Sequence, residues 1–524
     1  MKRIISALMV CAALWPAGSF AERILVAGDS LTGHSMNLPG RSGYYYQFMA
    51  ALRDAGVSGI ELVPLGGSGQ TVGSWRNVVR ESRQTERQLD IRGIFVKKEL
   101  DRGCDTLVIF LGMNDALSPT TSLDRAGEWK RQYRQLIDDL KTRLNFKRLV
   151  LASPTMCTEN PGNYRNRLMA RMDELVAELA AENGAVHARV WEEFGKFWRL
   201  GRMSDPAFRL TNDYVHPNRL GHAAIAIALL RAVGQEQAAD SWYRKIRKDL
   251  GPAAMGKPGM LLYTGTAAAP DRVVIHGEVS GFKPETVVAV SPGGLKTAER
   301  RIDGNQFTLS LQGELPQSET LKVIASAGEE RAEQTLQLHP PFLIATKIPS
   351  PRWFRGEEFQ AAQLETPIDR ALLENGDFLN APIDGRGTRA GWMAYYPGGD
   401  VVGGDDPGSV DFASCDDSPV FAQGFMVRYV HHETGGKATL RIGRRTFAAT
   451  IGATVYLNGK RVFRDFLKES SYDVEVELAP GWNLLAARCS HVNWQFQLSV
   501  ALTGIDGLRY SIKAPSADTA TLHR

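Results

Sequence analysis

The sequence contains little cysteine and little net charge. It has five cysteines among 524 residues and a formal net charge of +4 at pH 7. So few cysteines exclude a small scaffold held together by disulfides, and no Cys-x-x-Cys or His-rich spacing indicates a structural metal. The small net charge gives no reason to expect a nucleic acid or another polyanion as a partner.

Long apolar stretches are scarce as well. The run Ile4–Trp15 follows Lys2 and Arg3 and precedes Ser19-Phe20-Ala21, a small-x-small cleavage pattern. This order predicts a signal peptide over residues 1–21 and a secreted or periplasmic bacterial protein, with an uncleaved anchor as the alternative. The run is too short to span a bilayer together with its flanks, and we identify no later stretch that could form a transmembrane segment.

A chain of this length exceeds what one hydrophobic core usually holds, so we expect two or three domains. Residues 22–236 alternate strand-like and helix-like runs, which predicts an α/β domain with a doubly wound parallel sheet and helices on both faces. The expected strands are Ile24–Ala27, Ile60–Leu65, Asp105–Leu111, Arg148–Ser153 and Val186–Val190. The expected helices are Tyr44–Ala55, Trp129–Leu144, Arg165–Asn183 and His222–Val233.

The pattern changes after this domain. Residues 237–260 are predicted to form a helical spacer and linker. Short strands between turn residues then predict two all-β domains, a small β-sandwich over residues 261–341 and a β-jelly-roll over 342–512, with a frayed tail at 513–524. In the second of these, Asn458-Gly459 follows a strand-like run and predicts a hairpin turn.

Four short polar segments lie at the ends of these elements. Three of them, Gly28–Leu31, Gly66–Thr71 and Gly112–Asp115, follow expected strands, and the fourth, Asp213–Pro217, precedes the last helix. Ligands bind beyond the carboxyl ends of the strands in an open α/β sheet, so residues from these segments can converge. Ser30 stands where a nucleophile would be useful, and a serine hydroxyl then needs a base and an oxyanion site.

Taken in this order, the segments resemble the four blocks of the SGNH, or GDSL-type, serine hydrolase superfamily over roughly residues 23–234. The resemblance implies an SGNH-type flavodoxin-like sheet and an acyl-enzyme mechanism that needs no metal or organic cofactor. It implies that Ser30 is the nucleophile, that His216 is the general base and that Asp213 orients the base. The oxyanion donors that it implies are the backbone N–H groups of Ser30 and Gly69 and the side-chain amide of Asn114.

The residue types suit this chemistry. Histidine titrates near neutrality, so it can take a proton and return it, and Asp213 would fix its tautomer. A glycine at position 69 is expected to let the backbone approach closely, where a Cβ would hinder it. One position departs from the family. Many relatives have an asparagine two residues before the first glycine of the second block, and this chain has Pro64 there, which leaves Gly66 or Gly67 as alternatives to Gly69.

Simpler roles remain open for the same residues. Ser30 could only cap a helix, the pair His216-Pro217 could form a rigid turn, and the glycines could be turn residues. A phosphate site at Gly66–Gly69 is disfavoured because the lysine of a P-loop is missing. Other polar residues near the motifs are expected to order loops, to pack or to lie at the surface, namely Asp29, Asp115, His34 and His222.

The expected jelly-roll resembles the galactose-binding-like modules of carbohydrate enzymes, through Val455–Lys460 and Pro480–Leu485. Its aromatic residues could stack on sugar rings or form the core; those considered are Trp392, Tyr395, Tyr396 and Trp494. Its acidic residues Asp411, Asp416 and Asp417 could hold calcium or form a solvated loop. A disulfide between Cys415 and Cys489 is possible, whereas one between Cys104 and Cys157 is not expected, because these lie at opposite ends of the parallel sheet.

These features together predict an exported serine esterase that removes O-acyl groups, above all acetyl, from a carbohydrate. The alternatives are a lipase or lysophospholipase-type GDSL esterase and a non-catalytic cell-surface carbohydrate-binding protein. An acylated carbohydrate substrate is the expected partner. The sugar, the acyl position and the oligomeric state do not follow from the sequence.

Overall fold

A computed structural model describes most of the chain after residue 21. The described residues are 22–89, 93–118, 121–265, 272–313, 317–349, 365–374, 377–382, 391–397, 408–412, 422–444, 451–467, 469–491 and 497–513. The predicted signal peptide and nearly all of the predicted tail lie outside them, as do Cys415, Asp416, Asp417 and Trp494.

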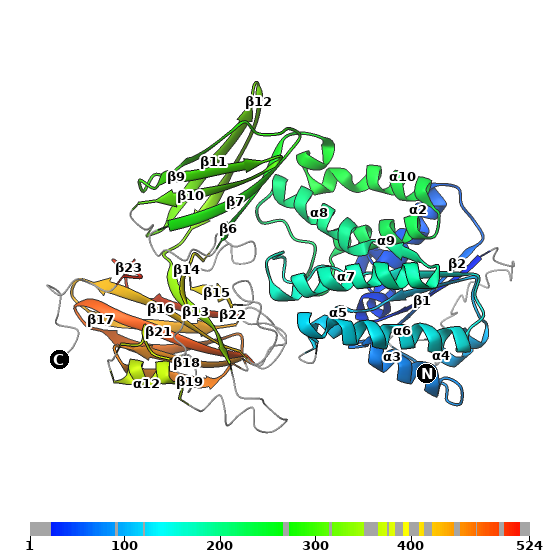
Figure 1. The fold of residues 1–524 in the computed structure, drawn as a ribbon, viewed down its shortest axis with the longest axis horizontal. Coiled ribbons are helices and arrows are strands. Elements are labelled where there is room, and N and C mark those ends of the chain that lie inside the picture. The colour runs from blue at the N-terminus through cyan, green and yellow to red at the C-terminus, as the bar shows by residue number, and fades with distance from the viewer. Residues whose placement is uncertain are drawn as a thin grey trace, which may run out of the picture.

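A five-stranded parallel sheet forms the centre of the first part of the chain, which we call the α/β unit (Figure 1). Its order, β2-β1-β3-β4-β5, is that of flavodoxin-like doubly wound sheets, as predicted. All of the strands except the short β5 are largely apolar, as expected for strands covered on both faces. The strands are β1 (Glu22–Gly28), β2 (Ile60–Gly66), β3 (Thr106–Phe110), β4 (Arg148–Ala152) and β5 (Val186–Ala188).

Helices cover both faces of this sheet (Figure 1). The four predicted helices are present as α2 (Tyr44–Asp54), α6 (Ala126–Arg143), α7 (Tyr164–Asn183) and α9 (Arg219–Ala232). The sequence interpretation did not include α3 (Val72–Glu81), α4 (Val96–Asp101) or α8 (Val190–Ser204). The short elements α1 (Ser30–Gly33) and α5 (Met113–Leu117) follow β1 and β3, and further short turns are η1 (His34–Met36), η2 (Pro39–Arg41) and η3 (Leu123–Arg125). Beyond α9 come α10 (Glu236–Ile246), η4 (Arg247–Leu250) and η5 (Pro252–Met255).

The next part, the β-sandwich unit, consists of two antiparallel sheets, ordered β6-β7-β10-β9 and β12-β11-β8. They share one apolar cluster, which also takes in Tyr396 and Ile512 from later parts of the chain. The first strand starts two residues earlier than the predicted boundary at 261, and β9 and β12 were not anticipated. The strands are β6 (Gly259–Gly265), β7 (Arg272–Ser280), β8 (Thr286–Val290), β9 (Lys296–Asp303), β10 (Gln306–Gln312), β11 (Glu319–Ala327) and β12 (Glu330–Leu338).

The C-terminal β unit, from β13 onward, has a larger sheet ordered β14-β13-β16-β21-β18-β19 and a smaller one ordered β15-β22-β17-β20, with β23 paired to β16. The Asn458-Gly459 hairpin is confirmed between β18 and β19, where both residues have positive φ, 50° and 73°. The strands are β13 (Phe342–Pro349), β14 (Trp392–Tyr395), β15 (Ser409–Asp411), β16 (Ala422–His432), β17 (Gly436–Gly443), β18 (Ile451–Leu457), β19 (Lys460–Phe466), β20 (Ser471–Leu478), β21 (Gly481–His491), β22 (Gln497–Thr503) and β23 (Arg509–Ser511); a short helix, α12 (Pro367–Leu373), lies beside them.

Burial decides several of the roles that the sequence left open in the C-terminal β unit. Tyr395 and Tyr396 are buried at 4% and 1% exposure, so they form core and offer no face to a sugar. Asp411 is not in a solvated loop, because it is 3% exposed and lies in β15. Cys489 is buried with a free thiol, so it forms no disulfide.

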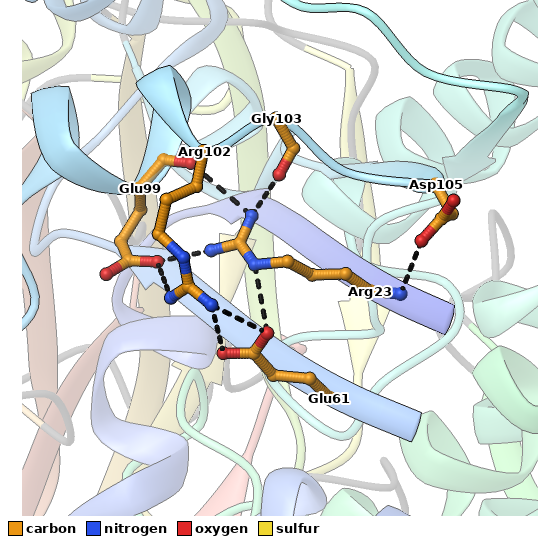
Figure 2. Close-up of polar contacts among 6 residues, drawn as sticks. All are labelled: Arg23, Glu61, Glu99, Arg102, Gly103 and Asp105. Carbon is orange, nitrogen blue, oxygen red and sulfur yellow. Dashed lines mark hydrogen bonds and ion pairs between the residues drawn. The ribbon is translucent and has the colours of Figure 1, made fainter. Parts of the chain in front are cut away.

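A buried ionic network joins β1, β2 and α4 at the amino end of the sheet (Figure 2). The guanidinium of Arg23 donates to Glu61 Oε2 at 3.0 Å, to Glu99 and to the carbonyl of Gly103. Arg102 donates to the same two carboxylates. This network lies at the opposite end of the strands from the four predicted site segments, so its role is to hold the sheet.

Candidate active site

Ser30 comes directly after the central strand β1. Asp29 caps the short helix α1, because its Oδ1 accepts the Leu31 N–H at 2.9 Å, and Ser30 is the first residue of that helix. Gly28 makes the sharp turn possible: a Cβ there would lie 2.1 Å from Thr32 Oγ1. The capping role left open for Ser30 is therefore filled by Asp29, and the Ser30 hydroxyl is available for other contacts.

The structure brings Ser30, His216 and Asp213 together although 186 residues separate the first two. Ser30 Oγ lies 3.1 Å from His216 Nε2, and His216 Nδ1 lies 2.7 Å from Asp213 Oδ2. Asp213 Oδ1 also accepts the backbone N–H groups of Val215 and His216, at 3.1 and 2.7 Å. A base in contact with a nucleophile, and oriented by a carboxylate, is the arrangement that activates a serine.

The electrostatics of the pair suit proton transfer. The hydrogen bond that His216 Nδ1 donates to Asp213 raises the pKa of His216 above its ordinary value of 6.5, against the opposing effect of partial burial. Burial would raise the pKa of Asp213, but the hydrogen bonds from the side chain and backbone of His216 outweigh it, so the pKa of Asp213 lies below its ordinary value. Asp213 is therefore ionised at neutral pH, and it stabilises a protonated imidazole beside it.

The other two predicted site residues lie in loops that leave neighbouring strands. Asn114, in α5 after β3, donates from Nδ2 to the carbonyl of Gln70 at 3.0 Å, and this bond ties its loop to the loop of Gly69 after β2. Gly69 has φ of +71°, a left-handed conformation, and a Cβ there would meet nothing within 4 Å. The left-handed backbone conformation by itself favours glycine at this position. Close approach is seen at Gly66, where a Cβ would lie 2.2 Å from Gly33 N.

Two buried carboxyl groups, those of Asp29 and Asp115, bind backbone N–H groups of the site segments. Asp29 caps α1, and both carboxylate oxygens of Asp115 accept the Val72 N–H at 3.2 Å, which braces the second block against the third. Both therefore order loops, as expected. Burial raises the pKa of each to about 7.

Of the two nearby histidines, only one is buried. His222 is 2% exposed and packs against Tyr44, and burial lowers its pKa to about 3, so it is a neutral core residue. The His34 ring centroid lies 5.5 Å from that of His216, and its Nε2 is 3.3 Å from Ser68 Oγ in the Gly69 loop. Nothing in the sequence indicated that His34 lies beside His216, because only the fold brings η1 next to the segment Asp213–Pro217.

Glu159 is a further residue that the sequence interpretation missed. It is 2% exposed, and its Oε1 accepts the N–H groups of Leu210 and Thr211 and the Thr211 hydroxyl, at 3.0, 2.7 and 2.5 Å. Burial raises the pKa of Glu159. It lies in the loop after β4, which carries none of the four motifs, and it holds the start of the segment that leads to Asp213 and His216.

Other kinds of site are not apparent in the part of the chain that the structure describes. No group of three or more His, Cys, Asp or Glu side chains there could hold a metal ion. No helix there is long and apolar enough to cross a membrane. A cavity of about 830 Å³ is lined by α8 and by residues of β6 and β7, among them Trp191, Tyr263 and Glu278, but by none of the predicted site residues.

The fold of the α/β unit is the SGNH-type α/β fold that the sequence resemblance implied. Residues 26–224 match the GDSL-like Lipase/Acylhydrolase family, so the α/β unit belongs to that family, as the resemblance implied. No curated protein sequence matches the chain.

Solved structures resemble part of the chain. The acetylxylan esterase Axe2 from Geobacillus stearothermophilus is 23% identical over 41% of this chain and 94% of its own, with a TM-score of 0.32. LAE5, an alpha/beta hydrolase enzyme from the metagenome of Lake Arreo in Spain, is 22% identical over 42% of this chain and 99% of its own, also with a TM-score of 0.32.

Proposed function

We propose that this protein is a serine esterase in which Ser30 is the nucleophile, His216 the general base and Asp213 the orienting carboxylate. The observation that carries the proposal is the continuous chain of contacts from Ser30 Oγ through His216 to Asp213, at 3.1 and 2.7 Å. Membership of an acylhydrolase family supports the same chemistry.

The reaction follows from the geometry. His216 Nε2 takes the proton of Ser30 as Oγ attacks the ester carbonyl, and the imidazolium that forms is stabilised by ionised Asp213. The tetrahedral intermediate collapses when His216 returns the proton to the leaving alcohol, which leaves an acyl group on Ser30. His216 then deprotonates a water, which attacks the acyl carbonyl, and it returns that proton to Ser30 Oγ as the bond between Oγ and the acyl carbon breaks and the acid is released.

Three donors are proposed to stabilise the negative charge on the carbonyl oxygen, from Ser30 N–H, Gly69 N–H and Asn114 Nδ2. An amide nitrogen carries two hydrogens, and Gln70 takes only one of those on Asn114. The bond to Gln70 therefore fixes the orientation of the amide while the second hydrogen serves the oxyanion. Donors fixed before the reaction need no reorganisation when the charge develops, which makes them effective.

The test of this function is labelling with a serine-directed organophosphate together with hydrolysis of 4-nitrophenyl acetate. The wild-type protein should be labelled on Ser30 and should turn over the ester, and Ser30→Ala should do neither. Ser35→Ala is a matched control, since Ser35 is a nearby buried serine whose hydroxyl is bonded to the Thr32 carbonyl. An unlabelled, inactive wild type would refute the esterase and leave a non-catalytic binding protein.

We further propose that the protein is exported and that its substrate is an O-acyl group, above all acetyl, on a carbohydrate. The predicted signal peptide and the two β units attached to the α/β unit support this. The burial of Tyr395 and Tyr396 removes two of the aromatic residues considered for sugar stacking, so the proposal does not rely on those two residues.

A chain-length series tests the substrate class. 4-Nitrophenyl acetate should be hydrolysed with a higher kcat/KM than the butyrate and octanoate esters, and acetate should be released from at least one member of a panel of acetylated glycans. A preference for octanoate would instead indicate a lipase or lysophospholipase.

A further inference from the structure

One buried hydrogen bond connects the C-terminal β unit to the α/β unit near the candidate active site. Asn163 Nδ2 donates to Asp411 Oδ2 at 3.1 Å, and each residue is only 3% exposed. Asp411 is held in place from its own side, because β15 pairs with β22 and the Asp411 N–H donates to the Tyr395 hydroxyl at 3.2 Å. Buried polar contacts of this kind are costly to break, since the partner left behind is unsatisfied.

Asn163 belongs to a loop that is shaped by its hydrogen bonds. Its Oδ1 caps α7 by accepting the Arg165 N–H at 2.9 Å, and its backbone N–H donates to the Asn160 carbonyl at 3.0 Å. The amide of fully buried Asn166 binds the carbonyls of Cys157 and Asn160, both at 2.5 Å. The loop Cys157–Asn163 is thus fixed to the start of α7.

The same loop contains two consecutive strained residues. Thr158 and Glu159 both have positive φ, 61° and 57°, a conformation that costs free energy for residues with a Cβ and persists only where the surroundings enforce it. This conformation turns both residues toward the segment that carries the candidate base. Thr158 N–H donates to the Tyr214 carbonyl at 2.7 Å, and Glu159 accepts three hydrogen bonds from Leu210 and Thr211.

We propose that Asp411 and Asn163 are positioning residues for the catalytic loop, so that the C-terminal β unit completes the active site. Docking of β15 fixes Asn163 and the strained loop, and that loop holds the segment Leu210–His216 through Leu210, Thr211 and Tyr214. Neither residue touches the reacting atoms. The inference rests on the proposed esterase function, and it gives the C-terminal β unit a role that does not require it to bind sugar.

Exchanging the hydrogen-bond donor and acceptor between Asn163 and Asp411 tests this proposal in the full-length protein. Asp411→Ala removes the acceptor, and Asn163→Asp keeps the α7 cap but places two carboxylates together. Each should lower kcat for 4-nitrophenyl acetate by about tenfold to a hundredfold, the usual cost of a small misplacement of catalytic groups, with KM changed by less than about twofold. The double variant N163D/D411N restores one donor and one acceptor, and it should return kcat to within about threefold of the wild type.

Gln334→Ala is the matched control. Gln334 Nε2 donates to the Arg202 carbonyl at 3.0 Å, so this variant also loses a hydrogen bond between a β unit and the α/β unit, yet its kcat should not change. Unchanged kcat in D411A, or a double variant no better than N163D, would overturn the proposal. If D411A does not fold, the comparison of N163D with the double variant decides. Failure of the esterase function is recognised separately, as a wild type that neither labels nor hydrolyses.

Discussion

Replacing Asp213 by asparagine should change the tautomer of His216 while the backbone conformation of its loop stays the same. Asp213 Oδ1 accepts two backbone N–H groups, at 3.1 and 2.7 Å, and Oδ2 faces His216 Nδ1 at 2.7 Å. Asparagine can keep both backbone bonds through its oxygen, so the loop should keep its conformation. Its NH₂ group then faces Nδ1 as a donor, which forces the imidazole to carry its hydrogen on Nε2. That nitrogen can no longer accept the proton of Ser30.

The expected loss is large and falls on kcat. A hydrogen bond to a charged group contributes about 1.5–3 kcal/mol, and the wrong tautomer removes the base as well. The corresponding change in serine protease triads lowers kcat about 10⁴-fold, which equals about 5.4 kcal/mol in activation free energy. We expect a loss of the same order for Asp213→Asn, with KM nearly unchanged because no contact with the substrate is removed.

The assay is the hydrolysis of 4-nitrophenyl acetate at pH 8, with thermal unfolding recorded in parallel. Asp205→Asn is the matched control: Asp205 is exposed, and its Oδ1 accepts only the Ala207 N–H at 2.8 Å among the contacts described. It should retain wild-type kcat. An Asp213→Asn protein with kcat within about tenfold of the wild type and unchanged unfolding would refute the assigned role of the carboxylate.

Three further outcomes are expected. Because the pKa of His216 is raised and only the neutral ring accepts a proton, kcat/KM should fall as the pH decreases through a value above 6.5, and a flat profile between pH 5 and 8 would exclude His216 as the base. Asn114→Ala should lower kcat about 10²–10³-fold with a small change in KM, as for other oxyanion donors, and an unchanged kcat would remove Asn114 from the site. Arg23→Met should destabilise the α/β unit by about 3 kcal/mol in urea unfolding, because it leaves Glu99 without its buried partner, whereas Arg102→Met, at 46% side-chain exposure, should cost less than about 1 kcal/mol; equal effects would contradict the reasoning.

The sequence predicted the parallel sheet well because its strands are apolar runs that end at glycine or at a polar turn. The predicted strands fall within a few residues of β1 to β5, and their order follows from the family resemblance. Val186–Val190 shows the limit: the apolar alternation continues past the three-residue strand β5 into α8, which starts at Val190. The strand β9 (Lys296–Asp303) was missed because it is almost wholly exposed and carries no alternation of apolar and polar residues.

The candidate site was predictable where its residues lie in short sequence motifs. Ser30, Asp213 and His216 lie in such motifs, and the structure places their side chains in contact. Glu159 and Asp411 lie in none. Their partners are 51 and 248 residues away, and a contact across such a separation leaves no local pattern of composition or periodicity. The positive φ of Gly69 was not predictable either, because it depends on the whole loop.

The buried thiols of Cys157 and Cys489 can report the unfolding of the units that contain them. Cys157 lies in the α/β unit and Cys489 in the C-terminal β unit, and both are wholly shielded from solvent. Burial raises the pKa of Cys157 to about 12 and also raises that of Cys489, so neither forms a reactive thiolate while its surroundings are folded. The rate at which an alkylating reagent modifies each residue, followed by peptide mass spectrometry, therefore measures how often the α/β unit and the C-terminal β unit each open.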